Sequence, residues 1–158
     1  MIHAVLLMLL AAASVTDIRS RIIPNIIPIL IVVLFLIGLI VSPDLRVDWP
    51  WRIAAFAIAF SVGFGLFVVG VMGGGDVKLF AALALFHNLS SLGLLALATS
   101  IAGAGVAIVF AFVEFIQRRT DAQRRGSLGE DLRTSMKTKI PYGVGIFLGQ
   151  LWVMYLAQ

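Results

Sequence analysis

Two aspartates are the residues of this chain whose type and position suggest chemistry. Asp76 follows three consecutive glycines, Gly73, Gly74 and Gly75, within a long apolar stretch, and Asp17 closes the first apolar segment. A carboxylate inside a bilayer costs about 2.5 kcal/mol or more. Glycine-rich backbone at that depth must lie against protein or a water-filled cavity. Both aspartates are therefore functional candidates, and we expect them to meet.

Two carboxyl groups at hydrogen-bonding distance cannot both ionise cheaply, so one keeps a proton while the other stays anionic. Such a pair can activate a water for attack on a peptide carbonyl and donate a proton to the carbonyl oxygen. Because the titration belongs to the pair, neither Asp17 nor Asp76 is assigned as the acid. A simpler interpretation of Asp17 is a local ion pair with Arg21, four residues further along a continued helix.

The glycines before Asp76 suggest how a substrate would bind. Without side chains, an extended Gly73–Gly75 backbone could pair with an unwound substrate strand, and we predict substrate binding there. The simpler interpretation is a tight loop between two helices. The two interpretations are compatible.

The composition indicates an integral membrane protein. Of 158 residues, 61% are hydrophobic and only 13% are charged, and the mean hydropathy is +1.06, whereas soluble domains are about 25% charged. The chain has no cysteine, and neither His3 nor His87 lies in a metal-ligand spacing. We therefore expect no metal and no cofactor. A net charge of +4 reports membrane orientation better than nucleic-acid binding.

The apolar segments predict an all-α fold of about six transmembrane helices in a single domain, residues 1–158. The stretch Val77–Ile116 is long enough for a hairpin of two helices, with its turn at His87–Ser91 at the far interface. We expect Pro24 to start the second helix. The expected segments are 2–16, 25–41, 53–72, the two arms of 77–116, and 140–156.

The basic residues predict the orientation of the bundle. Ten of the twelve Lys and Arg residues follow the first, third and fifth expected spans, and only Arg46 and Arg52 lie on the other side. The positive-inside rule then places both termini outside the cytoplasm and both aspartates on the cytoplasmic side. The polar segment 117–139 is either a surface amphipathic helix or a solvated loop, and Glu114 is either interfacial or a third buried acid.

The two aspartate motifs resemble those of a known family. Gly73-Gly74-Gly75-Asp76 fits the Gly-x-Gly-Asp motif of the membrane aspartic proteases that include type IV prepilin peptidases, preflagellin peptidases and presenilin. Asp17-Ile18-Arg19 with Ile23-Pro24-Asn25 is similar to the stretch that carries the first catalytic aspartate of prepilin peptidases. Pro141-Tyr142-Gly143 resembles the Pro-x-Gly that opens their last helix.

This resemblance implies a specific activity. By it, Asp17 and Asp76 are the catalytic pair, and Lys78, Pro141, Tyr142 and Gly143 support the site. The short chain looks like the branch that removes the leader peptides of Flp-type prepilins or pseudopilins at the cytoplasmic face of the bacterial inner membrane. The chain lacks the paired-cysteine domain of longer members, so we expect peptidase activity without N-methyltransferase activity.

Two other classes of function would use the same residues. A small proton-coupled transporter could relay protons through Asp17, Asp76 and Glu114, although the two halves of the chain show no inverted repeat. An inert membrane assembly protein would tolerate amides at both aspartates. The expected partners are a prepilin substrate and the lipid bilayer, with no nucleic acid, and a homo-oligomer could form through a face containing Gly145 and Gly149.

Overall fold

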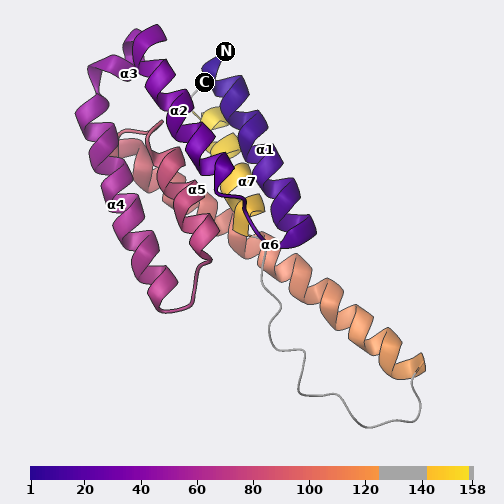
Figure 1. Cartoon of the computed structure of the whole chain (residues 1–158). Coiled ribbons are helices and arrows are strands. Elements are labelled where there is room, and N and C mark those ends of the chain that lie inside the picture. The colour runs from indigo at the N-terminus through magenta and orange to yellow at the C-terminus, as the bar shows by residue number, and fades with distance from the viewer. Residues whose placement is uncertain (125–141, 157–158) are drawn as a thin grey trace.

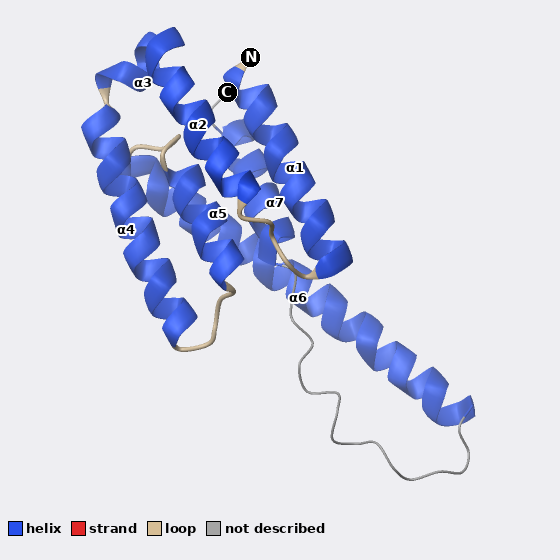
Figure 2. Ribbon diagram, in the orientation of Figure 1, coloured by secondary structure: helices blue, strands red, loops and turns tan. Residues whose placement is uncertain are grey.

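The computed structural model describes residues 1–124 and 142–156, and for Glu114 and residues 117–124 it describes the backbone alone. The described residues form an all-helical bundle (Figures 1 and 2). Met1 and the end of α7 lie at one end of the bundle, and α6 projects beyond the other end (Figure 1). The helices are α1 (Ile2–Ser20), α2 (Ile26–Val41), α3 (Pro43–Val47), α4 (Trp49–Val68), α5 (Gly74–Ala84), α6 (Leu89–Arg124) and α7 (Tyr142–Leu156).

The helix lengths agree only in part with the six expected membrane spans. Three helices, α1, α4 and residues Leu89–Val113 of α6, are long and apolar enough to cross a membrane, while α2 and α7 are apolar but shorter. At about 1.5 Å per residue, the 16 residues of α2 rise about 24 Å, less than a hydrocarbon core of about 30 Å. The helices of the described residues are thus compatible with a membrane protein, but they do not establish that the chain crosses the membrane six times.

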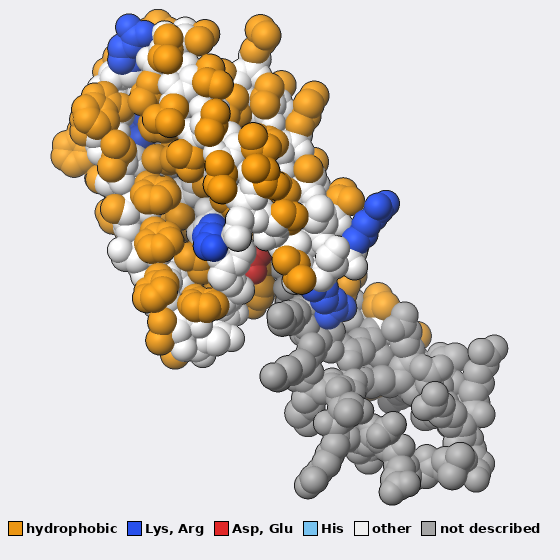
Figure 3. Space-filling model, viewed as in Figure 1, with side chains coloured by type: hydrophobic (Ala, Val, Ile, Leu, Met, Phe, Trp, Pro, Cys, Tyr) orange, Lys and Arg blue, Asp and Glu red, His pale blue; other side chains and the backbone are white. Residues whose placement is uncertain are grey.

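The outer surface of the bundle is apolar. Hydrophobic side chains cover most of the face seen in Figure 3, and residues such as Ile40 and Val69 are about three-quarters exposed, at 76% and 74%. A surface of this kind is rare on soluble monomers and suits contact with lipid. The buried core is also apolar, and its largest fully enclosed side chains are Leu6, Leu10, Ile31, Leu79, Leu83, Leu95 and Ile146.

Several predicted boundaries were wrong by a few residues. Helix α1 continues to Ser20, so Asp17 lies in its last turns, and α2 begins at Ile26, two residues after Pro24. Helix α5 begins at Gly74, which places Asp76 inside a helix rather than before one. The expected polar segment 117–139 lies largely outside the described residues, although α6 extends to Arg124.

The connection between α2 and α4 is partly helical. It contains the short helix α3, and Arg46 at its end folds back onto α2. The Arg46 Nε donates to Leu39 O at 3.0 Å, and its Nη2 donates to Ile40 O at 2.7 Å. Carbonyls in the last turn of a helix have no partner within the helix, and a cation there also complements the helix dipole. Arg46 therefore terminates α2.

His87 lies in the predicted turn, and its side chain is buried within the bundle. The side chain is 7% exposed, and its Nε2 lies 2.8 Å from Oε1 of the buried Gln150. Burial lowers the pKa of His87, which favours the neutral ring. The pair joins the end of α5 to α7. Asn88 then starts α6, because its Oδ1 accepts from the Ser91 N–H at 2.9 Å.

Helices α6 and α7 approach closely through small residues. A Cβ added at Gly145 would lie 2.7 Å from the Gly103 Cα, and one at Gly149 would lie 2.7 Å from the Thr99 Cα. The residues on each helix are four positions apart, a spacing that lets two helix backbones touch. Gly145 and Gly149, which the sequence offered as an oligomer face, are thus used within one chain.

We expect Gly149→Ala to lower the thermal unfolding temperature in detergent. The new methyl group would meet backbone atoms of Thr99, which cannot rotate away, and overpacking of this kind costs about 1–3 kcal/mol. Gly105→Ala in α6 is the matched control, because a Cβ there has nothing within 4 Å. If Gly149→Ala unfolds at the same temperature as Gly105→Ala, this packing is wrong.

Candidate functional site

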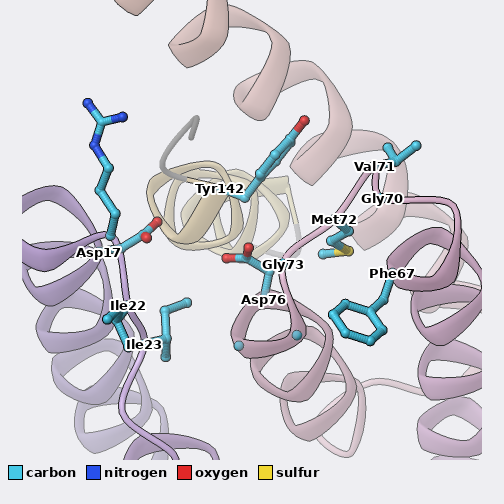
Figure 4. A pocket seen from close by; sticks show the side chains of 13 residues that line it. Asp17, Ile22, Ile23, Phe67, Gly70, Val71, Met72, Gly73, Asp76 and Tyr142 are labelled. Atoms are coloured by element: carbon cyan, nitrogen blue, oxygen red, sulfur yellow. The ribbon is translucent and has the colours of Figure 1, made fainter. Parts of the chain in front are cut away.

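The two aspartates line one pocket of about 630 Å³ at the end of the bundle from which α6 projects. Asp17 comes from the end of α1 and Asp76 from the start of α5. Figure 4 shows their carboxyl groups pointing toward one another across the pocket. Both residues are buried, at 6% and 8% exposure. The two aspartates thus share one pocket, as expected.

Asp17 is held by the N-terminus of α7. The backbone N–H of Gly143 donates to Asp17 Oδ2 at 2.7 Å, across 126 positions of sequence. Gly143 is the second residue of α7, so its N–H is one of those with no acceptor inside the helix. The positive end of the α7 dipole also favours an anion there. Asp17 therefore acts as a cap supplied by another helix.

Asp76 has an equivalent position on its own helix. It is the third residue of α5, and its Oδ2 lies over Gly73, the residue that precedes the helix. An acidic residue at this third position can accept from the backbone N–H of the residue before the helix, as in a capping box. Oδ1 of Asp76 is buried without a hydrogen-bond partner among the described residues. An unpaired buried oxygen is costly unless a ligand or water uses it.

The connection between α1 and α2 brings the two aspartates together. It packs directly on the first turn of α5, where a Cβ added at Gly75 would lie 3.1 Å from the Ile23 Cβ. Beside this contact, Lys78 Nζ donates to Asn25 Oδ1 at 3.0 Å. Only a glycine at position 75 permits this approach without displacing Ile23. Lys78 thus joins α5 to the connection before α2, and it does not line the pocket.

The other predicted site residues lie partly in the pocket and partly outside the described residues. Tyr142 lines the pocket with Gly73, Gly74 and Gly75, whereas Pro141 lies outside the described residues. Gly73 alone has extended backbone, because Gly74 and Gly75 belong to α5. The expected extended strand over all three glycines is therefore wrong. The glycines serve close packing as well as the pocket.

Arg21 also lines the pocket, but α1 does not continue through Arg21 as the predicted ion pair assumed. Helix α1 ends at Ser20, and Arg21 adopts a left-handed conformation with φ of 52°, while its N–H donates to Asp17 O. Arg21 and Asp17 line the same pocket, and the carboxylate of Asp17 also accepts from the Gly143 N–H.

One residue of the site was missed by sequence reasoning. Ser14 is 6% exposed, and its Oγ lies 2.9 Å from Leu10 O and 3.2 Å from Gly143 O. Three residues before Asp17, it occupies the same face of α1. A polar residue in this position of an apolar helix was the available signal. In the described part of the chain, no group of three or more His, Cys, Asp or Glu residues could hold a metal.

Apolar side chains form the rest of the pocket. Phe67, Val71 and Met72 line it from the end of α4 and the connection that follows. In Figure 4, Phe67 and Met72 lie on the Asp76 side, and Ile22 and Ile23 lie on the Asp17 side. The pocket thus pairs two carboxyl groups with apolar walls. Such a site can bind an apolar peptide segment and hold one of its amide bonds beside both acids.

Comparisons with known proteins match this part of the chain. The model of the type IV leader peptidase family matches residues 4–108, a range that contains both aspartates and ends within α6. No curated protein and no solved structure matches the chain.

The contact between α7 and Asp17 predicts a thermodynamic coupling. A methyl group added at Gly143 would lie 2.9 Å from Asp17 Oδ2 and 3.3 Å from Asp17 Cγ. We expect Gly143→Ala to destabilise the protein by about 1–3 kcal/mol, and by clearly less when Asp17 is also alanine. Thermal unfolding of the two single variants and the double variant measures this coupling. An equal cost in both backgrounds would contradict the contact.

Proposed function

Because the chain belongs to the type IV leader peptidase family, we propose that it is a membrane aspartic endopeptidase with Asp17 and Asp76 as the catalytic pair. The observation that carries this proposal is that both carboxyl groups face each other in one pocket. The substrate would be a type IV prepilin or pseudopilin of the Flp type, whose leader peptide is removed at the cytoplasmic face of the bacterial inner membrane.

The reaction consumes one water and one peptide bond. The ionised carboxylate takes a proton from the water, whose oxygen attacks the carbonyl carbon, and the protonated carboxyl gives its proton to the carbonyl oxygen. The departing nitrogen then takes a proton from the first carboxyl and the C–N bond breaks. As the intermediate collapses to a carboxylic acid, one of its two hydroxyls returns a proton to the second carboxylate. The products are a new carboxyl terminus and a new amino terminus, and the pair again holds one proton.

Each of the two aspartates lies at the N-terminus of a helix. The Gly143 N–H donates to Asp17, and Asp76 lies in the first turn of α5, where the positive end of the helix dipole favours an anion. Oriented backbone donors need no rearrangement during the reaction. The oxygen of Asp76 without a partner, Oδ1, remains available for a water or for the substrate carbonyl. Asp76 can therefore hold or release the shared proton through Oδ1.

Binding would use the apolar walls and the connection before α5. Phe67, Val71 and Met72 offer contact to apolar substrate side chains. Gly73, with φ of −74° and ψ of 145°, presents extended backbone next to Asp76. An amide must leave its helix before water can attack it, and extended backbone can pair with the exposed groups. The lack of a methyltransferase activity remains part of this proposal.

The geometry supports hydrolysis better than proton transport. Both aspartates lie at one end of the bundle, whereas a relay needs acids distributed along the path. The side chain of Glu114, the third member of such a relay, lies outside the described side chains. An inert assembly protein would have no need of two converging buried carboxyl groups, which are costly to retain.

We expect Asp17→Asn and Asp76→Asn each to abolish leader removal from a co-expressed prepilin. An amide cannot exchange the proton that the mechanism requires, and loss of an acid–base group lowers rates by about 100-fold or more. The readout is the ratio of precursor to mature pilin on a gel.

The control is Asp44→Asn, which alters an acidic residue in the first turn of α3, outside the pocket. We expect this variant to process the prepilin at the wild-type rate. Membrane insertion and unfolding temperature of all three variants should match those of the parent protein. Normal cleavage by either pocket variant would exclude the proposed pair.

A further inference from the structure

We propose that Ser14 is a positioning residue for Asp17: its hydroxyl ties α1 to the first turn of α7 and thereby holds the Gly143 N–H against the carboxylate. This inference rests on the proposed function, and it assigns a role to a residue outside both aspartate motifs. The observation behind it is that one glycine is held from both sides. Its N–H contacts Asp17, and its carbonyl oxygen contacts Ser14.

Distances and burial define this contact. Ser14 Oγ lies 3.2 Å from Gly143 O, and Gly143 N lies 2.7 Å from Asp17 Oδ2. Ser14 and Asp17 are both 6% exposed. The two α1 side chains are three residues apart and therefore share a face. They engage the two peptide groups that flank a single α-carbon of α7.

The contact matters because Gly143 has no side chain of its own to fix it. A Cβ at this position would lie 2.9 Å from Asp17 Oδ2, so glycine is required for the close approach. A glycine at the start of a helix is also the residue type with the most backbone freedom. The remaining constraint on its peptide planes comes from the groups that hydrogen-bond to them. Ser14 supplies one of these from a packed helix.

A simpler role for Ser14 is bonding within its own helix. Its hydroxyl also lies 2.9 Å from Leu10 O, and serines within helices often bond to the carbonyl four residues earlier. Thr16 provides the comparison, because its Oγ1 bonds only to Ala12 O and Ala13 O in the same helix. If bonding within α1 were the whole function of Ser14, loss of either hydroxyl would have similar effects.

The test compares Ser14→Ala, Ser14→Thr and Thr16→Ala in purified enzyme with a prepilin substrate. A displaced carboxylate lowers the chemical step more than binding, so we expect Ser14→Ala to reduce kcat about tenfold or more with KM within about twofold. Ser14→Thr, which keeps the hydroxyl, should recover most of the rate. Thr16→Ala should behave as the parent enzyme does. Equal kcat values for Ser14→Ala and Thr16→Ala would overturn the proposal.

A second readout is independent of activity. The Gly143 amide proton is protected by its bond to Asp17, so hydrogen exchange of a peptide covering the start of α7 reports this bond. We expect faster exchange there in Ser14→Ala and unchanged exchange in Thr16→Ala. Unchanged exchange in both would overturn the role of Ser14 even if the chain cleaves prepilins. Faster exchange in Ser14→Ala from a chain without peptidase activity would retain the contact and reject the proposed function.

Discussion

The site depends on one requirement: the N–H groups at the start of a helix must find acceptors when that helix begins inside an apolar bundle. Helix α7 meets this requirement with Asp17, which accepts from Gly143 at 2.7 Å, and α5 carries its own Asp76 in its first turn, with Oδ2 close to Gly73. A buried donor without a partner costs about 1–3 kcal/mol, and a buried carboxylate without donors costs more. Each aspartate and each helix start therefore removes a penalty that the other would carry. Two such helix starts converge at one end of the bundle, and this convergence places the two carboxyl groups in one pocket.

The surrounding packing keeps these helix starts in place. Gly145 and Gly149 let α7 lie directly on α6, and His87 joins the far end of α5 to Gln150 of α7. Ile23 and Asn25 join the end of α1 to the first turn of α5 through Gly75 and Lys78. The contacts thus connect α1, α5 and α7 on both sides of the pocket. Catalytic groups need positions held to within about 0.5 Å, and short polar contacts between backbones and buried side chains provide that precision in a bundle otherwise joined by apolar contacts.

The sequence identified the two acids that line the pocket, but not the contacts that hold them there. Two acids in an otherwise apolar chain identify themselves by their cost, and the alternation of basic loops placed Asp17 and Asp76 at one end. The expected helix boundaries failed where tertiary contacts decide them. Asp17, in the last turns of α1, has its partner in α7, and the first turn of α5 packs against Ile23 through Gly75. The bond between Gly143 and Asp17 spans 126 positions, and no local pattern indicates it. The partner of His87, Gln150, belongs to the last helix, so no local pattern indicated the burial of the His87 side chain.

The central claim is that both carboxyl groups act on the same peptide bond of a substrate. A leader peptide in which a hydroxyethylene group replaces the scissile amide tests this claim, since its hydroxyl occupies the position of the tetrahedral intermediate and such analogues bind about 100-fold or more tighter than substrates. Its affinity should be measured by titration calorimetry against the parent protein and against Asp17→Asn and Asp76→Asn. The account predicts tight binding to the parent and a loss of about tenfold or more with either asparagine. Equal affinity for all three proteins would contradict it.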